Sequence, residues 1–80
     1  MTLPLLKEGQ VAVVQSEVDT GIVLTPEGQR HLGEGEWFLV FDSIEEAQEF
    51  AMSVVLDKPE VECGLYDFKG NYLGPYRRAE

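Results

Sequence analysis

Residues 43–66 read SIEEAQEFAMSVVLDKPEVECGLY, and this stretch decides the fold of the chain. Ser43 followed three residues later by Glu46 is the pattern of a capping box, in which the serine hydroxyl accepts a backbone N–H at the start of a helix. Pro59 disfavours helical geometry at the residue before it, so the helix should end near Asp57. The stretch therefore predicts a helix bounded by these two signals.

The apolar residues of this helix recur at helical spacing and share one face, which we expect to pack on a sheet. They are Ile44, Ala47, Phe50, Ala51, Val54 and Val55. Beyond the helix, Val61, Cys63 and Leu65 alternate with polar or small residues, the period of a strand with one buried face. Asp67–Gly70 has the composition of a tight turn, so a further strand should return from Tyr72.

Upstream, two short β-rich runs, residues 11–14 and 21–25, are separated by a turn-like segment and predict a hairpin. The next segment, Thr25–Gly28, has proline and glycine at positions that a turn favours. An extra strand over residues 29–32 is therefore an open alternative. Trp37–Phe41 is an unbroken apolar run of strand length, which predicts a strand at the centre of the sheet.

The predicted order is β-β-(β)-β-α-β-β, where the bracketed strand is the segment at 29–32. We expect an α+β fold, a small single domain over residues 1–80 with a mostly antiparallel sheet of four or five strands and one helix packed on one face. Residues 1–9 and 77–80 are expected to be flexible ends.

Fifteen acidic residues against six basic ones give the chain a formal net charge of −9. The excess is regional, because residues 34–67 carry ten acids and one base, Lys58, while the rest of the chain is neutral overall. A negative surface repels nucleic acid and anionic membranes, so we expect neither as a partner. A basic protein is the partner that this charge favours.

The chain has no apolar run near the roughly 20 residues of a membrane span. Pro4 and Lys7 interrupt the apolar residues of the N-terminus well short of a signal peptide. Cys63 is the only cysteine, so no internal disulfide can form. These features together predict a reducing, cytoplasmic location.

Candidates for catalysis or metal binding are few. His31 is the only histidine, and a site built from it with Glu34 and Glu36 would lack the ligand set of a zinc centre, so an exposed loop is its expected setting. Cys63 lies on the apolar side of its strand, which predicts core packing and not nucleophilic chemistry. The acids on either side of Gly35 would repel a phosphate. We therefore expect no catalytic residue, bound metal or cofactor.

The outward face of the predicted helix carries the strongest binding candidates. They recur at i, i+4, i+7 and i+11, so two large apolar groups should emerge from an acidic surface: Glu45, Glu49, Met52 and Leu56. An ordinary solvated face is the alternative, because scattered surface hydrophobes are normal. Neighbouring acids and the aromatic residues of the last hairpin extend the candidate surface, and these are Glu60, Glu62, Tyr66 and Tyr72.

The sequence predicts a non-enzymatic, acidic protein-binding domain, of the inhibitor or immunity type, that engages a basic surface of its partner. The alternative is a small-ligand-binding or accessory domain acting as a homodimer, with a cleft between helix and sheet near Trp37 and Tyr66. Pairing of the last strand, which ends at Pro75, with the same strand of a second copy would supply the dimer contact.

Overall fold

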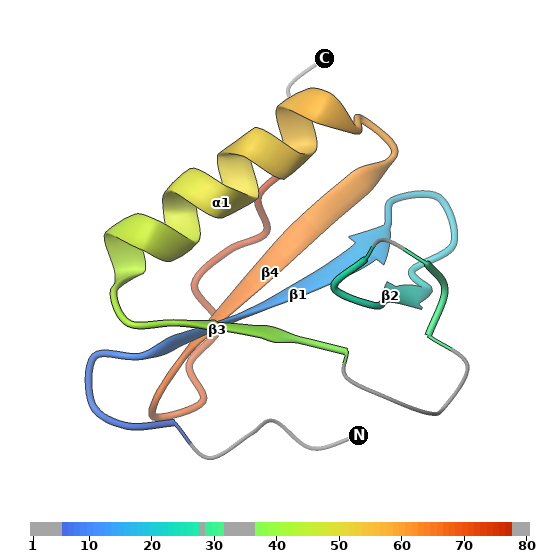
Figure 1. The fold of residues 1–80 in the computed structure, drawn as a ribbon. Coiled ribbons are helices and arrows are strands. Elements are labelled where there is room, and N and C mark those ends of the chain that lie inside the picture. The colour runs from blue at the N-terminus through green and yellow to red at the C-terminus, as the bar shows by residue number, and fades with distance from the viewer. Residues whose placement is uncertain (1–5, 28, 32–36, 78–80) are drawn as a thin grey trace.

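β1, Val11–Glu17, is the strand around which the sheet is built (Figure 1). The structure is a computed structural model that describes residues 6–27, 29–31 and 37–77. β4, Val61–Asp67, pairs antiparallel with the full length of β1. On its other side, β1 pairs antiparallel with β3, Leu39–Phe41, through its first half and with β2, Val23–Leu24, through its second half. The result is a four-stranded antiparallel sheet.

α1, Ile44–Asp57, packs on one face of this sheet and connects β3 to β4 (Figure 1). Both of those strands run antiparallel to β1, which lies between them. The helix therefore joins two mutually parallel strands that are not neighbours. An antiparallel sheet with one helix on one face is the predicted α+β fold, which is confirmed.

The prediction that Trp37–Phe41 is a central strand is wrong. Only Leu39–Phe41 are in a strand, and among the described residues they pair with β1 alone. Val40 is 41% exposed, whereas Val11–Val13 of β1 are buried. A continuous apolar run indicates a strand covered on both faces. β1 meets that condition, while in β3 only the residues beside Val40 pack against the core.

The ends of α1 lie where the local signals place them. Ser43 has the extended backbone of an N-cap, and its hydroxyl accepts the Glu46 N–H at 3.2 Å. The helix ends at Asp57, and the N–H of Lys58 closes the last turn on the Val54 carbonyl at 2.8 Å. Both predicted boundaries are confirmed. They could be predicted from the sequence because the signals that end a helix depend on neighbouring residues only.

The buried face of α1 follows the predicted spacing, with Ala47, Ala51 and Val55 at its centre and Phe50 and Val54 at its margins. The two alanines present so little side chain that the helix can approach the sheet closely. Ile44 departs from the prediction, because it is 38% exposed. It is the first helical residue and precedes the first buried position by one turn.

The first hairpin is confirmed, with Gln15 opposite Leu24 where β1 pairs with β2. Beyond β2 the chain turns back, and Arg30 forms an isolated bridge with Leu24. At its described residues, the extra strand considered for 29–32 is thus one bridge and not a strand. Leu32 lies outside the described residues.

Asp67–Gly70 forms the predicted turn. The Gly70 N–H donates to the Asp67 carbonyl at 3.0 Å, and Gly70 adopts a φ of 82°, in the left-handed region that glycine favours. Residues 72–76 then follow the outer edge of β4 and are held to it by isolated bridges. They do not make a continuous ladder, because Pro75 has no N–H to donate.

Of the ends predicted to be flexible, residues 1–5 and 78–80 lie outside the described part of the chain. The described positions near them make specific contacts. The Gln10 N–H donates to the Lys7 carbonyl at 2.9 Å, and Arg77 forms an ion pair with Glu62.

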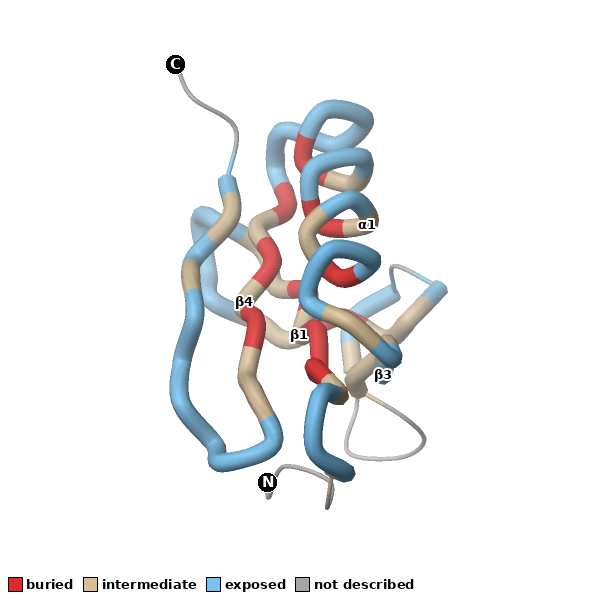
Figure 2. Tube along the Cα trace, turned by 90° about the vertical axis from the view of Figure 1, so that its left-hand side faces the viewer, coloured by how far each residue is buried: buried red, intermediate tan, exposed pale blue. Residues whose placement is uncertain are grey.

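The core lies between α1 and the side chains of β1 and β4 that face it, as the buried segments in Figure 2 show. Its largest fully buried side chains are Val13, Val55, Cys63 and Leu65. The outer face of α1 and the far side of the sheet therefore hold the surfaces that can meet a partner.

Replacing Ser43 with alanine removes the acceptor of the Glu46 N–H, so we expect the free energy of unfolding to fall by about 1 kcal/mol. Ser53→Ala is the matched control, because Ser53 lies inside α1 and its hydroxyl donates to the Phe50 carbonyl one turn back. Alanine has the higher helix propensity there, so stability should stay level or rise slightly. Urea unfolding measures both variants, and equal losses would contradict the capping role.

Candidate binding surfaces

The outer face of α1 forms a shallow depression that we term the helix surface. Its residues are Glu45, Gln48, Glu49, Met52, Ser53 and Leu56. The two large apolar side chains are well exposed, Met52 at 47% and Leu56 at 62%. The structure therefore brings four of the predicted binding residues together on one surface, with acids toward the start of the helix and apolar groups toward its end.

The charge of α1 is of one sign. Its ionisable residues are Glu45, Glu46, Glu49 and Asp57, and the helix contains no base. The first two lie in the first turn, where a carboxylate interacts favourably with the helix dipole. Asp57 lies at the opposite end, where the dipole is itself negative. The C-terminal turn of α1 therefore combines one carboxylate, Asp57, with the negative end of the helix dipole.

The remaining predicted binding residues lie elsewhere. Glu62 and Tyr66 alternate with the buried Cys63 and Leu65 along β4, so they face away from α1. The structure therefore does not bring the acidic helix and the neighbouring strand onto one surface. Strand alternation is the reason, because a residue next to a core position points to the other side of the sheet.

Tyr66 and Tyr72 form what we term the tyrosine face, on the side of the sheet opposite α1. Their ring centroids lie 5.1 Å apart at an interplanar angle of 49°. Gly64 makes this arrangement fit, because a Cβ at that position would lie 3.0 Å from Cε1 of Tyr72. Burial raises the pKa of the Tyr72 hydroxyl, with smaller effects from neighbouring charges. Beside the rings lies a hollow of about 240 Å³.

The other two predicted binding acids, Glu62 and Glu60, lie outside the helix surface. Glu62, beside the tyrosine face, is paired with Arg77. Glu60 is exposed in the turn between α1 and β4 and lines a hollow that also contains Glu17 and Arg30. Arg30 donates to Glu17 at 3.1 Å, and this hydrogen bond holds the pKa of the Glu17 carboxyl below its usual range.

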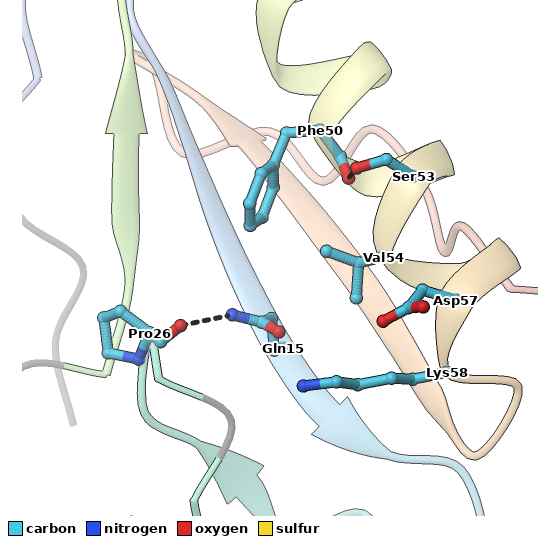
Figure 3. Close-up of a pocket in the computed structure, with 7 residues that line it drawn as sticks. All are labelled: Gln15, Pro26, Phe50, Ser53, Val54, Asp57 and Lys58. Atoms are coloured by element: carbon cyan, nitrogen blue, oxygen red, sulfur yellow. Dashed lines mark hydrogen bonds between the residues drawn. The ribbon is translucent and has the colours of Figure 1, made fainter.

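A pocket that sequence reasoning missed lies between α1, β1 and the turn after β2 (Figure 3). This Gln15 pocket measures about 360 Å³ and is lined by Gln15, Pro26, Phe50, Ser53, Val54, Asp57 and Lys58. Gln15 is 5% exposed, and its Nε2 donates to the Pro26 carbonyl at 3.4 Å. The signal for it was in the sequence, since Gln15 continues the alternation of Val11 and Val13 with a polar side chain.

The Gln15 pocket also corrects the cleft predicted near Trp37 and Tyr66. The described pocket between helix and sheet lies beside the second half of β1, and neither of those aromatic residues lines it. Tyr66 faces the other side of the sheet. Trp37 is half-buried and packs edge-to-face on Phe38 at 5.3 Å between ring centroids.

The candidates for metal or nucleophilic chemistry find no support in their settings. Within residues 6–27, 29–31 and 37–77, no group of three His, Cys, Asp or Glu side chains could hold a metal ion. His31 is half-buried, not exposed as predicted, because its N–H donates to the Val23 carbonyl at 2.9 Å and holds it along β2. Glu34 and Glu36 lie outside the described residues, as does Gly35. Cys63 is fully buried, as predicted.

Comparisons with known protein families, with curated proteins and with solved structures give no match to this chain. In the part of the chain that the structure describes, no helix combines the length and the apolar character needed to span a bilayer. The candidate function therefore rests on the chemistry of the helix surface, the tyrosine face and the Gln15 pocket.

Cys63 provides a test of the core's integrity. Burial, and secondly the charge of Glu62, raises the pKa of its thiol from 9.0 to about 11. We expect a thiol reagent at pH 8 to leave the folded domain unmodified and to react once urea unfolds it, because the thiolate is the reactive species. Fast modification without denaturant would contradict the buried position.

The same pKa shift predicts how stability depends on pH. The folded protein favours the neutral thiol, so this stabilisation is fully present below pH 9.0 and is lost as the pH rises toward about 11. Urea unfolding at pH 8 and pH 11 should show the loss, and Cys63→Ala should lose less over the same range. Identical pH dependence in both proteins would show that the thiol does not contribute.

Proposed function

We propose that this domain is a non-enzymatic protein-binding module whose helix surface engages a basic protein. The observation that carries the proposal is the exposure of Met52 and Leu56 beside Glu45 and Glu49 on one face of α1. Apolar side chains that emerge from a charged rim are typical of interface cores. A cationic surface with a small apolar centre is the complement of this one.

Charge and apolar contact would contribute at different stages of binding. The net charge of −9 and the absence of any base in α1 favour encounter with a positive surface. Once the partner has docked, desolvation of Met52 and Leu56 would slow its dissociation. An inhibitor or immunity-type protein that covers a basic functional surface of an enzyme would use charge for the encounter and apolar contact for the docked complex in this way. The single free cysteine, Cys63, is consistent with a reducing compartment such as the cytoplasm.

Reversing the charge of the helix surface tests the proposal. We expect Glu45→Lys with Glu49→Lys to abolish capture of a basic protein from extracts of the native host. The reason is that both acids border the apolar groups that anchor the partner. Glu8→Lys with Glu27→Lys is the matched control, since it makes the same change of net charge at exposed positions outside α1. Circular dichroism should show that both variants stay folded.

The salt dependence of the isolated complex provides the second readout. Association with the captured protein should slow markedly between 50 mM and 500 mM salt, while dissociation changes little. Sedimentation of the domain alone, at the same concentrations, reports whether it forms a homodimer instead. Retained capture by the helix variant, or equal loss in the control variant, would remove the helix surface as the binding site.

A further inference from the structure

The Gln15 pocket contains a hydrogen-bond acceptor that the described part of the fold leaves open. Gln15 is 5% exposed, and the one hydrogen bond that its side chain makes to the described residues uses Nε2, which donates to the Pro26 carbonyl. No fully buried side-chain oxygen or nitrogen of the described residues lacks a partner, so the unpaired amide oxygen of Gln15 keeps some exposure, and Gln15 lines the pocket. Figure 3 shows this oxygen pointing away from Pro26, toward the side where Asp57 and Lys58 lie.

Apart from Lys58, the pocket's other groups favour a cation with an apolar stem. The Asp57 carboxylate supplies further acceptors, and Phe50 and Val54 supply an apolar wall. The pocket also lies at the C-terminal turn of α1, which contains no basic residue. A positive group placed there interacts favourably with the helix dipole.

We propose that the Gln15 pocket binds the guanidinium group of an arginine. A guanidinium is planar and presents five donors, so it offers donors for both the Gln15 amide oxygen and the Asp57 carboxylate. Its methylene stem would lie along Val54, and its plane can stack on the Phe50 ring. That the arginine belongs to a basic protein partner rests on the proposed function. The binding of a guanidinium by the pocket does not depend on it.

The position of the pocket suits a partner seated on the helix surface. Both hollows are lined by Ser53, so they meet along one side of α1. A partner docked over Met52 and Leu56 could therefore insert an arginine beside it. Lys58 extends across the pocket in Figure 3 with its ammonium group on the Gln15 side. The incoming arginine must displace this exposed side chain.

Titration of the ¹⁵N-labelled 80-residue chain with N-acetyl-arginine amide tests the pocket directly. We expect saturable NMR shifts of the Gln15 side-chain amide and of the backbone amides at Ser53, Val54 and Lys58, with half-saturation near 1 mM. N-acetyl-lysine amide should bind several-fold more weakly, because an ammonium is a compact, strongly hydrated charge without the planar fork of donors of a guanidinium.

Three substitutions assign the contacts. Gln15→Met keeps the shape but removes the amide, and Asp57→Asn removes the charge, so each should weaken binding about tenfold. Lys58→Ala removes the competing ammonium and should strengthen binding. Gln29→Met is the matched control, because it makes the same chemical change at an exposed position outside the pocket lining and the helix surface, and it should leave binding unchanged.

Equal binding of the lysine compound, or unchanged binding in Gln15→Met, would overturn the proposal, since either would indicate attraction to surface acids in general. Binding of N-acetylglycine that depends on Lys58 would also overturn it and would assign an anion to the pocket. The proposed function fails separately, through retained capture by the helix variant. Arginine binding at the pocket would survive that result.

Discussion

The fold depends on the packing of α1 against the paired strands β1 and β4. Their ladder spans both strands completely, and Val13, Cys63 and Leu65 project from it into the space that α1 closes. Alanines at the centre of the helix's inner face let it lie close to this ladder, and the buried Val55 packs in the same core cluster. β2 and β3 each pair with only half of β1. They complete the sheet, but the position of the sheet against α1 depends on β1 and β4.

This packing determines which surfaces remain for binding. Once the alanine face of α1 is committed to the core, the opposite face must be exposed, and that face carries Met52 and Leu56 among acids. The same constraint turns Gly64 and Tyr66 of β4 to the far side of the sheet, where Tyr72 packs over the glycine. The helix surface and the tyrosine face are thus on opposite sides of one core.

The elements that the sequence predicts well are those specified by neighbouring residues. Ser43 and Pro59 bound the helix locally, and the turn at Gly70 needs only its own four residues. The order of strands is different, because it depends on which strand pairs with which. The apolar run before Phe41 is longer than β3 and suggested a central strand, yet β1 took that place by pairing on both sides. No local pattern contains that information.

The surfaces could be predicted in part for the same reason. Helical spacing correctly grouped Glu45, Glu49, Met52 and Leu56, since it needs one element only. Adding Glu62 to them was inconsistent with strand alternation, because Cys63 beside it was already expected in the core. The Gln15 pocket required residues from α1, β1 and the turn after β2, which only the assembled fold brings together.

The acidic character of α1 is costly at one end, and this bears on its role. Asp57 lies where the helix dipole is negative and where a lysine or arginine would stabilise the helix by about 0.3–1 kcal/mol. The first basic residue, Lys58, comes after the helix has ended, and it extends over the Gln15 pocket. A cation supplied from outside would relieve the same unfavourable potential. Binding a basic partner at this end would therefore add to the stability of the domain as well as to the affinity of the complex.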